Sequence, residues 1–228
     1  MNILGIIPAR GGSKRIPKKN SKLFLGNPII QYPIKTALNT NLFTDLIVST
    51  DCNEIKRISI ASGAKVPFMR PPELSDDFTS TAPVIIHALN WMELNLNKKY
   101  DYICCIYATT PLLRPNFLIE SFNLLKRKNA SAVFAVTEYE HSIFRALKIN
   151  KNGFLEMYWP ENQMKRSNDL ENAYHDAGQF YWLETKSFMK FNNMWPPESL
   201  PYLLPRSLAQ DIDTEEDWSL LEKIYRNP

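Results

Sequence analysis

Residues 2–20 read NILGIIPARGGSKRIPKKN and decide the fold. The first part, residues 2–8, is apolar almost throughout, which is typical of a strand buried on both faces of a parallel sheet. Residues 9–20 then combine two adjacent glycines with five lysines and arginines, although glycine is scarce in this chain. Glycines after a strand let backbone N–H groups approach a phosphate closely, and Lys and Arg bind phosphate oxygens. The stretch therefore predicts a strand followed by a polyphosphate-binding loop, with a solvated basic turn as the alternative.

Outside this stretch, short apolar runs alternate with amphipathic segments. Further strands are expected at 45–50, 65–69, 101–107 and 131–137. Helices are expected at 28–40, 53–62, 80–97 and 115–128. This alternation of strands and helices predicts βαβ units with right-handed crossovers. The expected fold class is therefore α/β with a mostly parallel sheet.

The alternation of strands and helices breaks down after residue 140. Strand character recurs at 143–149, 154–159 and 178–184, and a last helix is expected over 214–226. The segments between these strands are polar and irregular. We interpret residues 140–175 as an excursion from the sheet that serves as a lid, a dimer arm or both. Because no repeat or linker divides the chain, residues 1–228 are expected to form a single domain that contains this inserted arm.

The composition argues against several classes of protein. A net charge of +3 is too small to indicate a nucleic-acid partner. No apolar run approaches the roughly 20 residues of a membrane span, and the first residues lack the basic region of a signal peptide. Three cysteines cannot form a disulfide framework, and no Cys/His spacing suggests zinc. We therefore expect a cytoplasmic protein without a membrane or nucleic-acid partner.

The basic loop also carries a longer pattern. Arg10, Ser13, Lys14, Lys19 and Asn20 match Arg-x-x-Ser-Lys-x-x-x-x-Lys-Asn, so the loop resembles the signature of the CMP-sialic acid synthetase family of sugar cytidylyltransferases. The resemblance implies a Rossmann-like nucleotidyltransferase fold in which this loop grips the phosphates of CTP. Catalytic roles on the phosphates are thereby implied for Arg10, Lys14 and Lys19. The other loop residues implied around the nucleotide are Ala9, Gly11, Gly12, Ser13 and Asn20.

A second stretch, residues 70–77, reads RPPELSDD and resembles the R-P-x-E-L-x-x-D segment of the same family. Small hydroxyl residues follow it, and the resemblance implies that Arg70 and Ser80 or Thr81 contact the cytidine. Each assignment has a structural alternative. Arg70 could form a surface ion pair with an aspartate of the same segment, and Ser80 could cap a helix.

Near the end of the chain, residues 210–218 read QDIDTEEDW. In an extended Asp-Ile-Asp both carboxylates point to the same side, where they could share one magnesium ion. Alternatively, Asp213 or Thr214 caps the last helix, whose positive first turn suits the acids at 215–217. The segment also resembles a Q-x-I-D-T-x-E-D-like segment of the family, whose aspartates bind magnesium. The resemblance thus implies Mg²⁺ as the cofactor, held by Asp211 and Asp213.

Two segments depart from the sialic acid enzymes. Tyr107 stands where those enzymes have a glutamine expected to face the sugar, and residues 174–182, YHDAGQFYW, lack their arginine before an Asn-Gly pair. Both departures, and the block from 159 to 182, look like the pseudaminic acid cytidylyltransferases. This resemblance runs from residue 2 to about residue 221. The residues suited to the sugar are Tyr107, Arg166, His175, Gln179, Phe180 and Tyr181.

Several of these sugar contacts have alternatives. Arg166, with Lys165, is suited to the sugar carboxylate. The aromatic residues at 180–182 could instead form a buried strand. His175 could be a core histidine paired with Asp176, or the two could act as an acid-base pair.

The resemblance implies an enzyme that transfers CMP from CTP to pseudaminic acid, a nine-carbon acidic sugar of bacterial surface glycans. The anomeric hydroxyl would attack the α-phosphorus in line and pyrophosphate would leave, while the loop and magnesium neutralise charge. Alternative sugars are N-acetylneuraminic acid, legionaminic acid and KDO, and a CTP-binding sensor without turnover is the alternative outside enzymes. The arm resembles the one through which family members dimerise, so a homodimer is expected.

Overall fold

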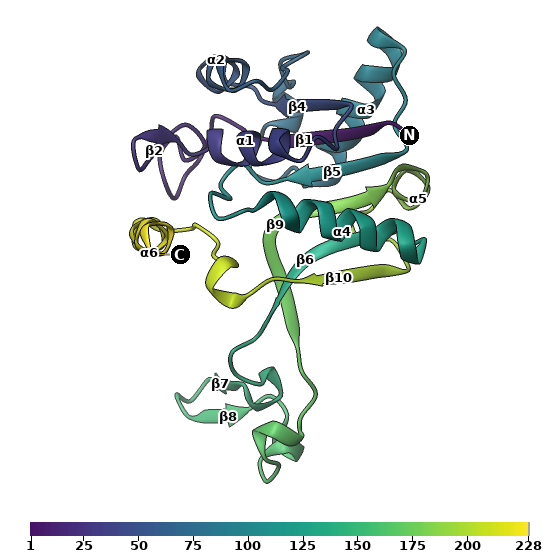
Figure 1. Cartoon of the computed structure of the whole chain (residues 1–228). Helices are drawn as coiled ribbons and strands as arrows, with labels where there is room; N and C mark the ends of the chain where they lie inside the picture. Colours follow the sequence, from purple (N-terminus) through teal and green to yellow (C-terminus); the bar gives the residue numbers. More distant parts are fainter. Residues whose placement is uncertain (228) are drawn as a thin grey trace.

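The opening apolar stretch forms β1 (Ile3–Pro8) in the interior of a six-stranded sheet (Figure 1). The computed structural model describes residues 1–227. The strand order in the sheet is β10-β6-β9-β5-β1-β4. The other strands are β4 (Asp45–Ser49), β5 (Tyr102–Ile106), β6 (Ala132–Glu138), β9 (Tyr174–Glu184) and β10 (Ser199–Leu203). β1 pairs in parallel with β4 and β5, and β10 with β6, whereas β9 is antiparallel to both neighbours. The predicted α/β class with a mostly parallel sheet is confirmed.

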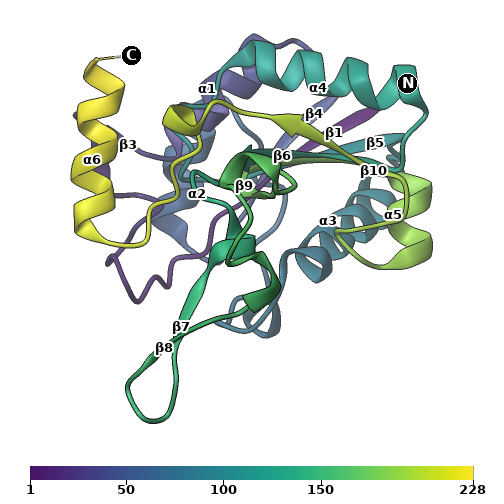
Figure 2. The ribbon, with the colours of Figure 1, turned by 90° about the horizontal axis from the view of Figure 1, so that it is seen from below.

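Helices cover both faces of this sheet. They are α1 (Gln31–Asn39), α2 (Asn53–Ala61), α3 (Thr81–Leu96), α4 (Pro115–Lys128), α5 (Thr185–Phe191) and α6 (Glu215–Arg226). Buried side chains of α1, α2, α4 and α6 join one apolar cluster, and those of α3 and α5 join another. Figure 2 shows α1 and α4 on one side of the sheet and α3 and α5 on the other. All the predicted helices form, whereas the sequence pattern did not predict α5.

The strand predicted at 65–69 does not form. Only Lys65 pairs with the sheet, in an isolated parallel bridge to Ile47 of β4. Pro67 lacks an N–H group and so cannot continue the ladder of hydrogen bonds. The chain instead runs along the sheet edge as a loop, and the Arg70 N–H donates to the Thr50 carbonyl at 2.7 Å. This loop therefore places Arg70 close to the carboxyl end of β4.

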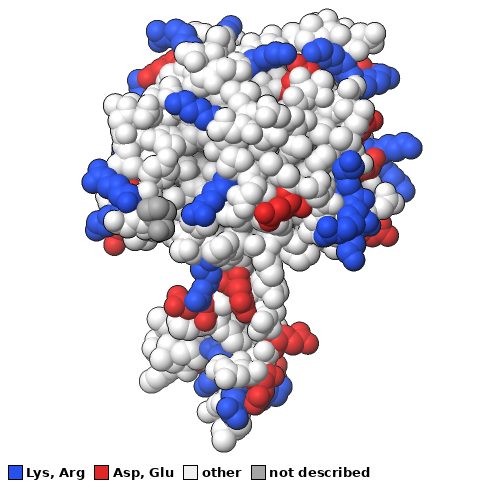
Figure 3. Space-filling model, in the orientation of Figure 1, with Lys and Arg blue, Asp and Glu red and all other residues white. Residues whose placement is uncertain are grey.

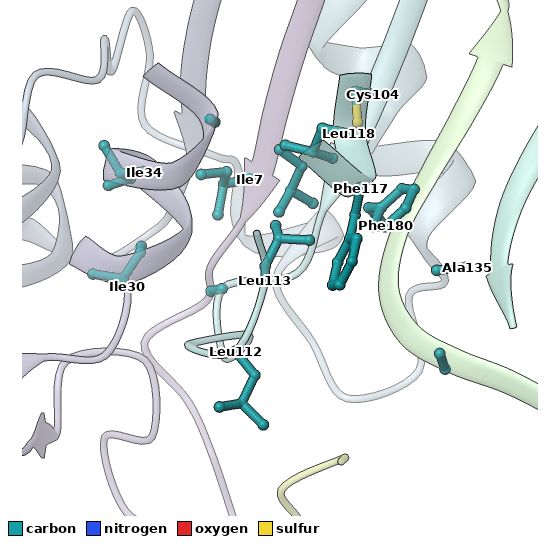
Figure 4. Close-up of a cluster of buried hydrophobic side chains, with 14 of the residues drawn as sticks. Ile7, Ile30, Ile34, Cys104, Leu112, Leu113, Phe117, Leu118, Ala135 and Phe180 are labelled. Atoms are coloured by element: carbon teal, nitrogen blue, oxygen red, sulfur yellow. The ribbon is translucent and has the colours of Figure 1, made fainter. Parts of the chain in front are cut away.

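Gly5 lies inside β1 at a point where no side chain fits. A Cβ there would lie 2.7 Å from Leu46 Cδ1 and 2.9 Å from Phe43 Cδ1. The Phe43 ring in turn stacks on Trp182 of β9, with centroids 5.7 Å apart and planes 9° apart. Close packing of this aromatic pair explains a glycine that the phosphate loop does not. Figure 4 shows another part of the same apolar cluster, which includes Ile7, Leu118 and Phe180.

Between β6 and β9 the chain leaves the sheet and forms an arm. A short antiparallel hairpin, β7 (Leu147–Ile149) and β8 (Leu155–Met157), lies within this arm, clear of the body in Figure 1. The strands predicted at 143–149 and 154–159 are therefore shorter than expected. A second small hairpin, β2 (Leu23–Phe24) and β3 (Asn27–Pro28), follows the basic loop. Among residues 1–227, none of the helices has the length and apolar character needed to cross a membrane.

Candidate active site

A polar cleft of about 310 Å³ lies beyond the carboxyl ends of β1 and β5. These strands are neighbours, and β4 pairs with β1 on its other side, so this is where an open α/β sheet reverses its strand order and binds ligands. The cleft brings together residues from four segments that are far apart in the sequence. The predicted site residues that line it are Arg10, Lys19, Asn20, Arg70, Ser80, Thr81, Tyr107, Asp211 and Asp213. An adjoining hollow of about 440 Å³ adds Gly12, Ser13 and Lys14.

Two cations of the basic loop converge on one carboxylate. The Arg10 guanidinium donates to the Asp76 carbonyl and lies 2.7 Å from Asp77 Oδ1, and the Lys14 ammonium contacts Asp77 Oδ2. The Lys14 hydrogen bond holds the pKa of Asp77 below its usual value, although partial desolvation opposes this. Asp77 thus occupies the place between Arg10 and Lys14 that a phosphate group could take.

The two loop glycines differ in their surroundings. A Cβ on Gly11 would lie 2.9 Å from Cys52 Cβ, whereas a Cβ on Gly12 would meet nothing within 4 Å. The Gly11 N–H donates to Asp51 Oδ1 at 2.8 Å. Gly11 is therefore required for the close packing of the loop against the start of α2, rather than for a free N–H group. Ala9 is fully buried, and its N–H donates to the Ser49 carbonyl, which fixes the start of the loop to β4.

Lys19 links the loop to the C-terminal acidic segment. Its ammonium donates to the Ile212 carbonyl and lies 3.9 Å from Asp213 Oδ1. Burial lowers the pKa of Lys19, while the charges of Asp211 and Asp213 partly offset that effect. Lys18 instead turns away and pairs with Glu54 at 3.0 Å. Lys19 is therefore the lysine of this pair that faces the cleft.

Asn20 and Arg15 complete the contacts of the loop. Asn20 Nδ2 donates to the Arg10 carbonyl at 2.9 Å and so braces the loop across its base. The Arg15 guanidinium lies 2.5 Å from Asp213 Oδ2. Arg15 is one of the five cations of the basic loop, and the sequence predicted no role for it. The structure places it in the cleft beside Asp213.

Arg70 is buried without full pairing. Its side chain is only 4% exposed, and among residues 1–227 neither Nε nor Nη2 has a hydrogen-bond partner. Asp51 is 4.0 Å from Nη2, and no ion pair with Asp76 or Asp77 is present in the described chain, so the alternative of a surface pair is wrong. Burial lowers the pKa of Arg70, although Asp51 opposes the shift. A buried guanidinium with free N–H groups at a cleft is suited to an acceptor on a ligand.

The two hydroxyl residues open α3. Ser80 occupies the N-cap position, but its side chain makes no capping hydrogen bond. Its hydroxyl is therefore free at the cleft, contrary to the alternative that it serves as a helix cap. The Thr81 hydroxyl lies 3.1 Å from the Tyr107 hydroxyl, which joins the start of α3 to the segment after β5.

The acidic segment keeps two carboxylates free of the helix cap. Thr214 caps α6 and forms a capping box with Asp217, so neither Asp211 nor Asp213 uses its side chain as the cap. Both line the cleft, whereas Ile212 between them is fully buried, as expected for an extended segment. Two hard carboxylate oxygen donors on one side fit a magnesium ion that completes its shell with phosphates and water. Within residues 1–227, no larger group of His, Cys, Asp and Glu is arranged to hold a metal.

The tyrosines predicted to face the sugar lie together. The rings of Tyr107 and Tyr181 are 5.2 Å apart, and burial raises the pKa of both phenols. The Tyr181 hydroxyl donates to Asp176 Oδ2 at 2.6 Å. The sequence placed Asp176 only as a partner of His175, whereas the structure pairs it with Tyr181. Their spacing of five residues along a bulged strand is not a pattern that reveals this contact.

Tyr107 lines the cleft, whereas Tyr181 is buried behind it and the other four predicted sugar contacts also lie outside the lining of this chain's cleft. Phe180 is fully buried among the core residues of Figure 4, because its side chain faces the α4 side of the sheet. Gln179 is also buried, and its amide donates to the Leu208 carbonyl. His175 lies at the base of the arm, where Nδ1 is 3.0 Å from the Asp176 carbonyl and the ring is 4.7 Å from the Tyr139 ring. Arg166 is exposed on the arm itself, just before a short 3₁₀ turn.

These placements settle the structural alternatives for β9. The buried-strand interpretation holds for Phe180 and also for Trp182, which is fully buried. His175 is half-buried and contacts the backbone oxygen of Asp176 rather than its carboxylate. It is therefore not a core histidine paired with the Asp176 carboxylate.

Comparison with known proteins gives a family match and similar chains. A family model described as Cytidylyltransferase matches residues 4–194. The chain is 41% identical over 226 residues to pseudaminic acid cytidylyltransferase of Campylobacter jejuni subsp. jejuni (strain 81-176), covering 99% of this chain and 97% of that protein. It is 29% identical over 234 residues to CMP-N,N'-diacetyllegionaminic acid synthase of Legionella pneumophila, covering 98% of this chain and 96% of that protein.

A solved structure shares the fold. CMP:2-keto-3-deoxy-manno-octonic acid synthetase complexed with CTP superimposes with a TM-score of 0.72, covering 100% of this chain and 99% of that one. The two chains are only 14% identical, so the likeness is evidence of the fold alone.

Proposed function

Because this chain belongs to the cytidylyltransferase family, we propose that it transfers CMP from CTP to pseudaminic acid. The anomeric hydroxyl oxygen of the sugar forms a bond to the α-phosphorus, the bond to pyrophosphate breaks, and the hydroxyl proton is released. The observation that carries this proposal is the extent of the likeness to the Campylobacter enzyme, which runs the whole length of both chains. The three free cysteines suit a reducing compartment, and we place the reaction in the cytoplasm.

Arg10 and Lys14 are proposed to hold the triphosphate. Both now contact Asp77, an exposed carboxylate that the more highly charged triphosphate would displace. Exposed ion pairs of this kind contribute little stability, so they exchange readily for a ligand. Lys19 is half-buried and faces the same cleft, where it would neutralise charge on the phosphates.

Arg70, Ser80 and Thr81 are proposed to receive the cytidine. Arg70 lines the cleft with two buried nitrogens, Nε and Nη2, that lack partners, and Ser80 adds a hydroxyl that is not used in a helix cap; these donors suit the acceptors of a pyrimidine base or its ribose. Asp211 and Asp213 would hold Mg²⁺, which when bound neutralises phosphate charge and lowers the pKa of the attacking hydroxyl. Arg15 and Lys19 keep Asp213 oriented toward the cleft.

We also propose that two copies of the chain form a dimer through the arm. Its tip exposes large apolar side chains, among them Ile149 at 73% and Phe154 at 69% exposure. Figure 3 shows the arm projecting from the body, with much of its surface uncharged in this view. An arm that crosses to a second copy would also carry Arg166 toward that copy's cleft, which explains why Arg166 lies outside its own.

The decisive experiment is an assay of pyrophosphate release with CTP, magnesium and a panel of acidic sugars. We expect the highest kcat/KM with pseudaminic acid and lower values with legionaminic acid, N-acetylneuraminic acid and KDO. A higher value with any of the others would assign the enzyme to that sugar instead. CTP binding without pyrophosphate release from any sugar would identify a sensor rather than an enzyme.

A further inference from the structure

Asp176 is a carboxylate held in place by uncharged donors. The Tyr181 hydroxyl donates to Oδ2 at 2.6 Å, and the Gly178 N–H donates to Oδ1 at 2.8 Å. Asp176 is nevertheless exposed, and within residues 1–227 it forms no ion pair with a lysine or arginine. Each carboxylate oxygen can accept more than one hydrogen bond, so Asp176 retains acceptor capacity toward solvent.

Asp176 does not line the cleft itself, but its neighbours contact or approach residues that do. On one side, its partner Tyr181 lies against Tyr107, whose hydroxyl contacts Thr81 at the start of α3. On the other side, Gly178 faces the acidic segment, because a Cβ on Gly178 would lie 3.9 Å from the carboxyl carbon of Asp211. Hydrogen bonds and ring contacts thus link Thr81 through the two tyrosines to Asp176, and the Gly178 backbone next to it lies close to Asp211.

The charge of Asp176 restricts what it can bind. Both proposed substrates are anions, and an unpaired carboxylate repels their phosphates and their carboxylate. Asp176 can therefore face only a neutral part of the sugar that donates hydrogen bonds. The amide N–H of an acylamino group is such a donor. Unlike a hydroxyl, it can only donate a hydrogen bond and cannot accept one.

We propose that Asp176 accepts a hydrogen bond from an acylamino N–H of the sugar. The inference rests on the proposed function and names the residue by which the site distinguishes acylamino sugars. Because Asp176 repels the anionic end of the sugar, it also directs that end away from β9. Tyr181 is a positioning residue in this scheme, since its hydroxyl fixes the carboxylate.

Asp176→Asn is the test variant, because it preserves the shape of the side chain and both fixed contacts. The amide oxygen can accept from the Gly178 N–H, and the amide nitrogen can donate to the Tyr181 hydroxyl. The nitrogen then presents an N–H where the carboxylate presented an acceptor. Two N–H groups would face each other, so we expect the KM for pseudaminic acid to rise about tenfold to a hundredfold, with the KM for CTP unchanged.

The direction of the change in KM distinguishes a hydrogen bond between Asp176 and the sugar from a general effect of the Asp176 charge. Removing a negative charge near two anionic substrates should by itself lower both KM values. A fall in both values, or no change, would overturn the proposal, and so would an altered dependence on CTP or magnesium alone. Glu93→Gln serves as the matched control, because Glu93 is an exposed carboxylate on α3 outside the cleft.

Two further measurements keep the test independent of folding and of the proposed function. CTP binding by the variant without sugar should match that of the native chain. If Asp176→Asn fails this check, Tyr181→Phe is the second variant, because it removes the hydrogen bond that fixes the carboxylate and leaves the charge of Asp176 unchanged. For this variant we expect a smaller rise in KM, confined to the sugar. A nine-carbon acid with hydroxyls in place of both acylamino groups, used as substrate or competitive inhibitor, should lose less affinity with Asp176→Asn. Failure of the proposed function would instead appear as no pyrophosphate release by the native chain.

Discussion

Arg70 has an almost completely buried guanidinium, and neither its Nε nor its Nη2 has a partner within residues 1–227. Burying a charge without hydrogen bonds is costly, and Asp51 at 4.0 Å gives it only a distant counter-charge. The cost is understandable if a ligand supplies the missing acceptors. Arg70 thereby illustrates how a position can lower the stability of the empty protein and raise its affinity for substrate.

We therefore predict that Arg70→Met separates stability from binding. The empty variant should unfold at the same temperature as the native chain or a higher one, because the uncompensated charge is gone. The KM for CTP should rise at least about tenfold, since hydrogen bonds from a charged donor are lost. Thermal unfolding and steady-state kinetics measure the two effects. Arg57→Met, on the exposed surface of α2, is the control and should change neither. A clear loss of stability with an unchanged KM would make Arg70 a structural residue.

At the scale of elements, α6 fixes the acidic segment to the body. Its capping box joins Thr214 and Asp217, and its Trp218 ring packs on Phe24 with centroids 5.8 Å apart. The N–H of Asp213 also donates to Asp217 Oδ2 at 3.0 Å. The cap thus orients the backbone immediately beside the two carboxylates proposed to hold the metal.

Thr214→Ala should consequently weaken both the helix and the site. We expect a loss of about 1 kcal/mol in the free energy of unfolding, the usual contribution of an N-cap hydroxyl. We also expect more magnesium to be needed for half-maximal activity, because the segment that carries Asp211 and Asp213 loosens. Urea unfolding and a magnesium titration provide the readouts, and Thr214→Ser, which keeps the hydroxyl, should behave like the native chain. Equal stability of the alanine and serine variants would contradict the role of the cap.

Sequence patterns predicted these elements where local rules decide them. The helix at 115–128 begins with a proline in its first turn, and the predicted and observed boundaries agree. The strand predicted at 65–69 does not form, because Pro67 lacks the N–H group that a continuous strand ladder needs. The prediction gave more weight to the apolar composition of this segment than to its proline. The cleft residues were found through motifs whose residues lie close together in the sequence. Arg15 and Asp176 were missed, because their partners Asp213 and Tyr181 are set by folding rather than by sequence spacing.

At the scale of the whole molecule, a buried carboxylate ties three segments at one edge of the sheet. Asp45 accepts hydrogen bonds from Lys65 at 2.6 Å, Lys98 at 2.8 Å and the Tyr100 hydroxyl at 2.7 Å. Burial alone would raise the pKa of Asp45, but these three donors outweigh it and lower the pKa below its usual value near 3.8. The network therefore depends on the carboxylate remaining ionised.

This shift predicts how stability depends on pH. A carboxyl group whose pKa is lowered by folding stabilises the protein above its unfolded pKa, and that stability is lost as the pH falls through the folded value. Asp45→Asn should thus lower the free energy of unfolding by about 2 kcal/mol at pH 7 and reduce the further loss below about pH 4. Denaturant unfolding across this range measures both effects. Glu93→Gln, which breaks only the exposed pair with Lys99, should leave the profile nearly unchanged. An identical acid profile for Asp45→Asn and the native chain would remove Asp45 as the cause.

The arm raises the question of how many copies make one working enzyme. Replacing Ile149 and Phe154 together by aspartate should yield monomers in sedimentation experiments, because charges at the tip cannot be buried between two copies. Leu94→Asp, an 84% exposed apolar position on α3, should leave the dimer intact. A monomeric native chain, or a dimer that survives the tip substitutions, would contradict the arm as the interface.

Mixing two damaged chains then asks whether Arg166 acts in the cleft of the partner. Arg166→Ala should raise the sugar KM, and Asp211→Asn should abolish turnover while CTP binding persists. A dimer of one chain of each kind has one cleft with both an intact Asp211 and an intact Arg166 only if the arms cross. Random mixing makes half of the dimers mixed, so at low sugar concentration activity should recover to about a quarter of the native level. Activity no greater than that contributed by the Arg166→Ala chains alone would show that each cleft relies on its own arm. The recovery therefore distinguishes an arm that only holds two copies together from one that completes the site.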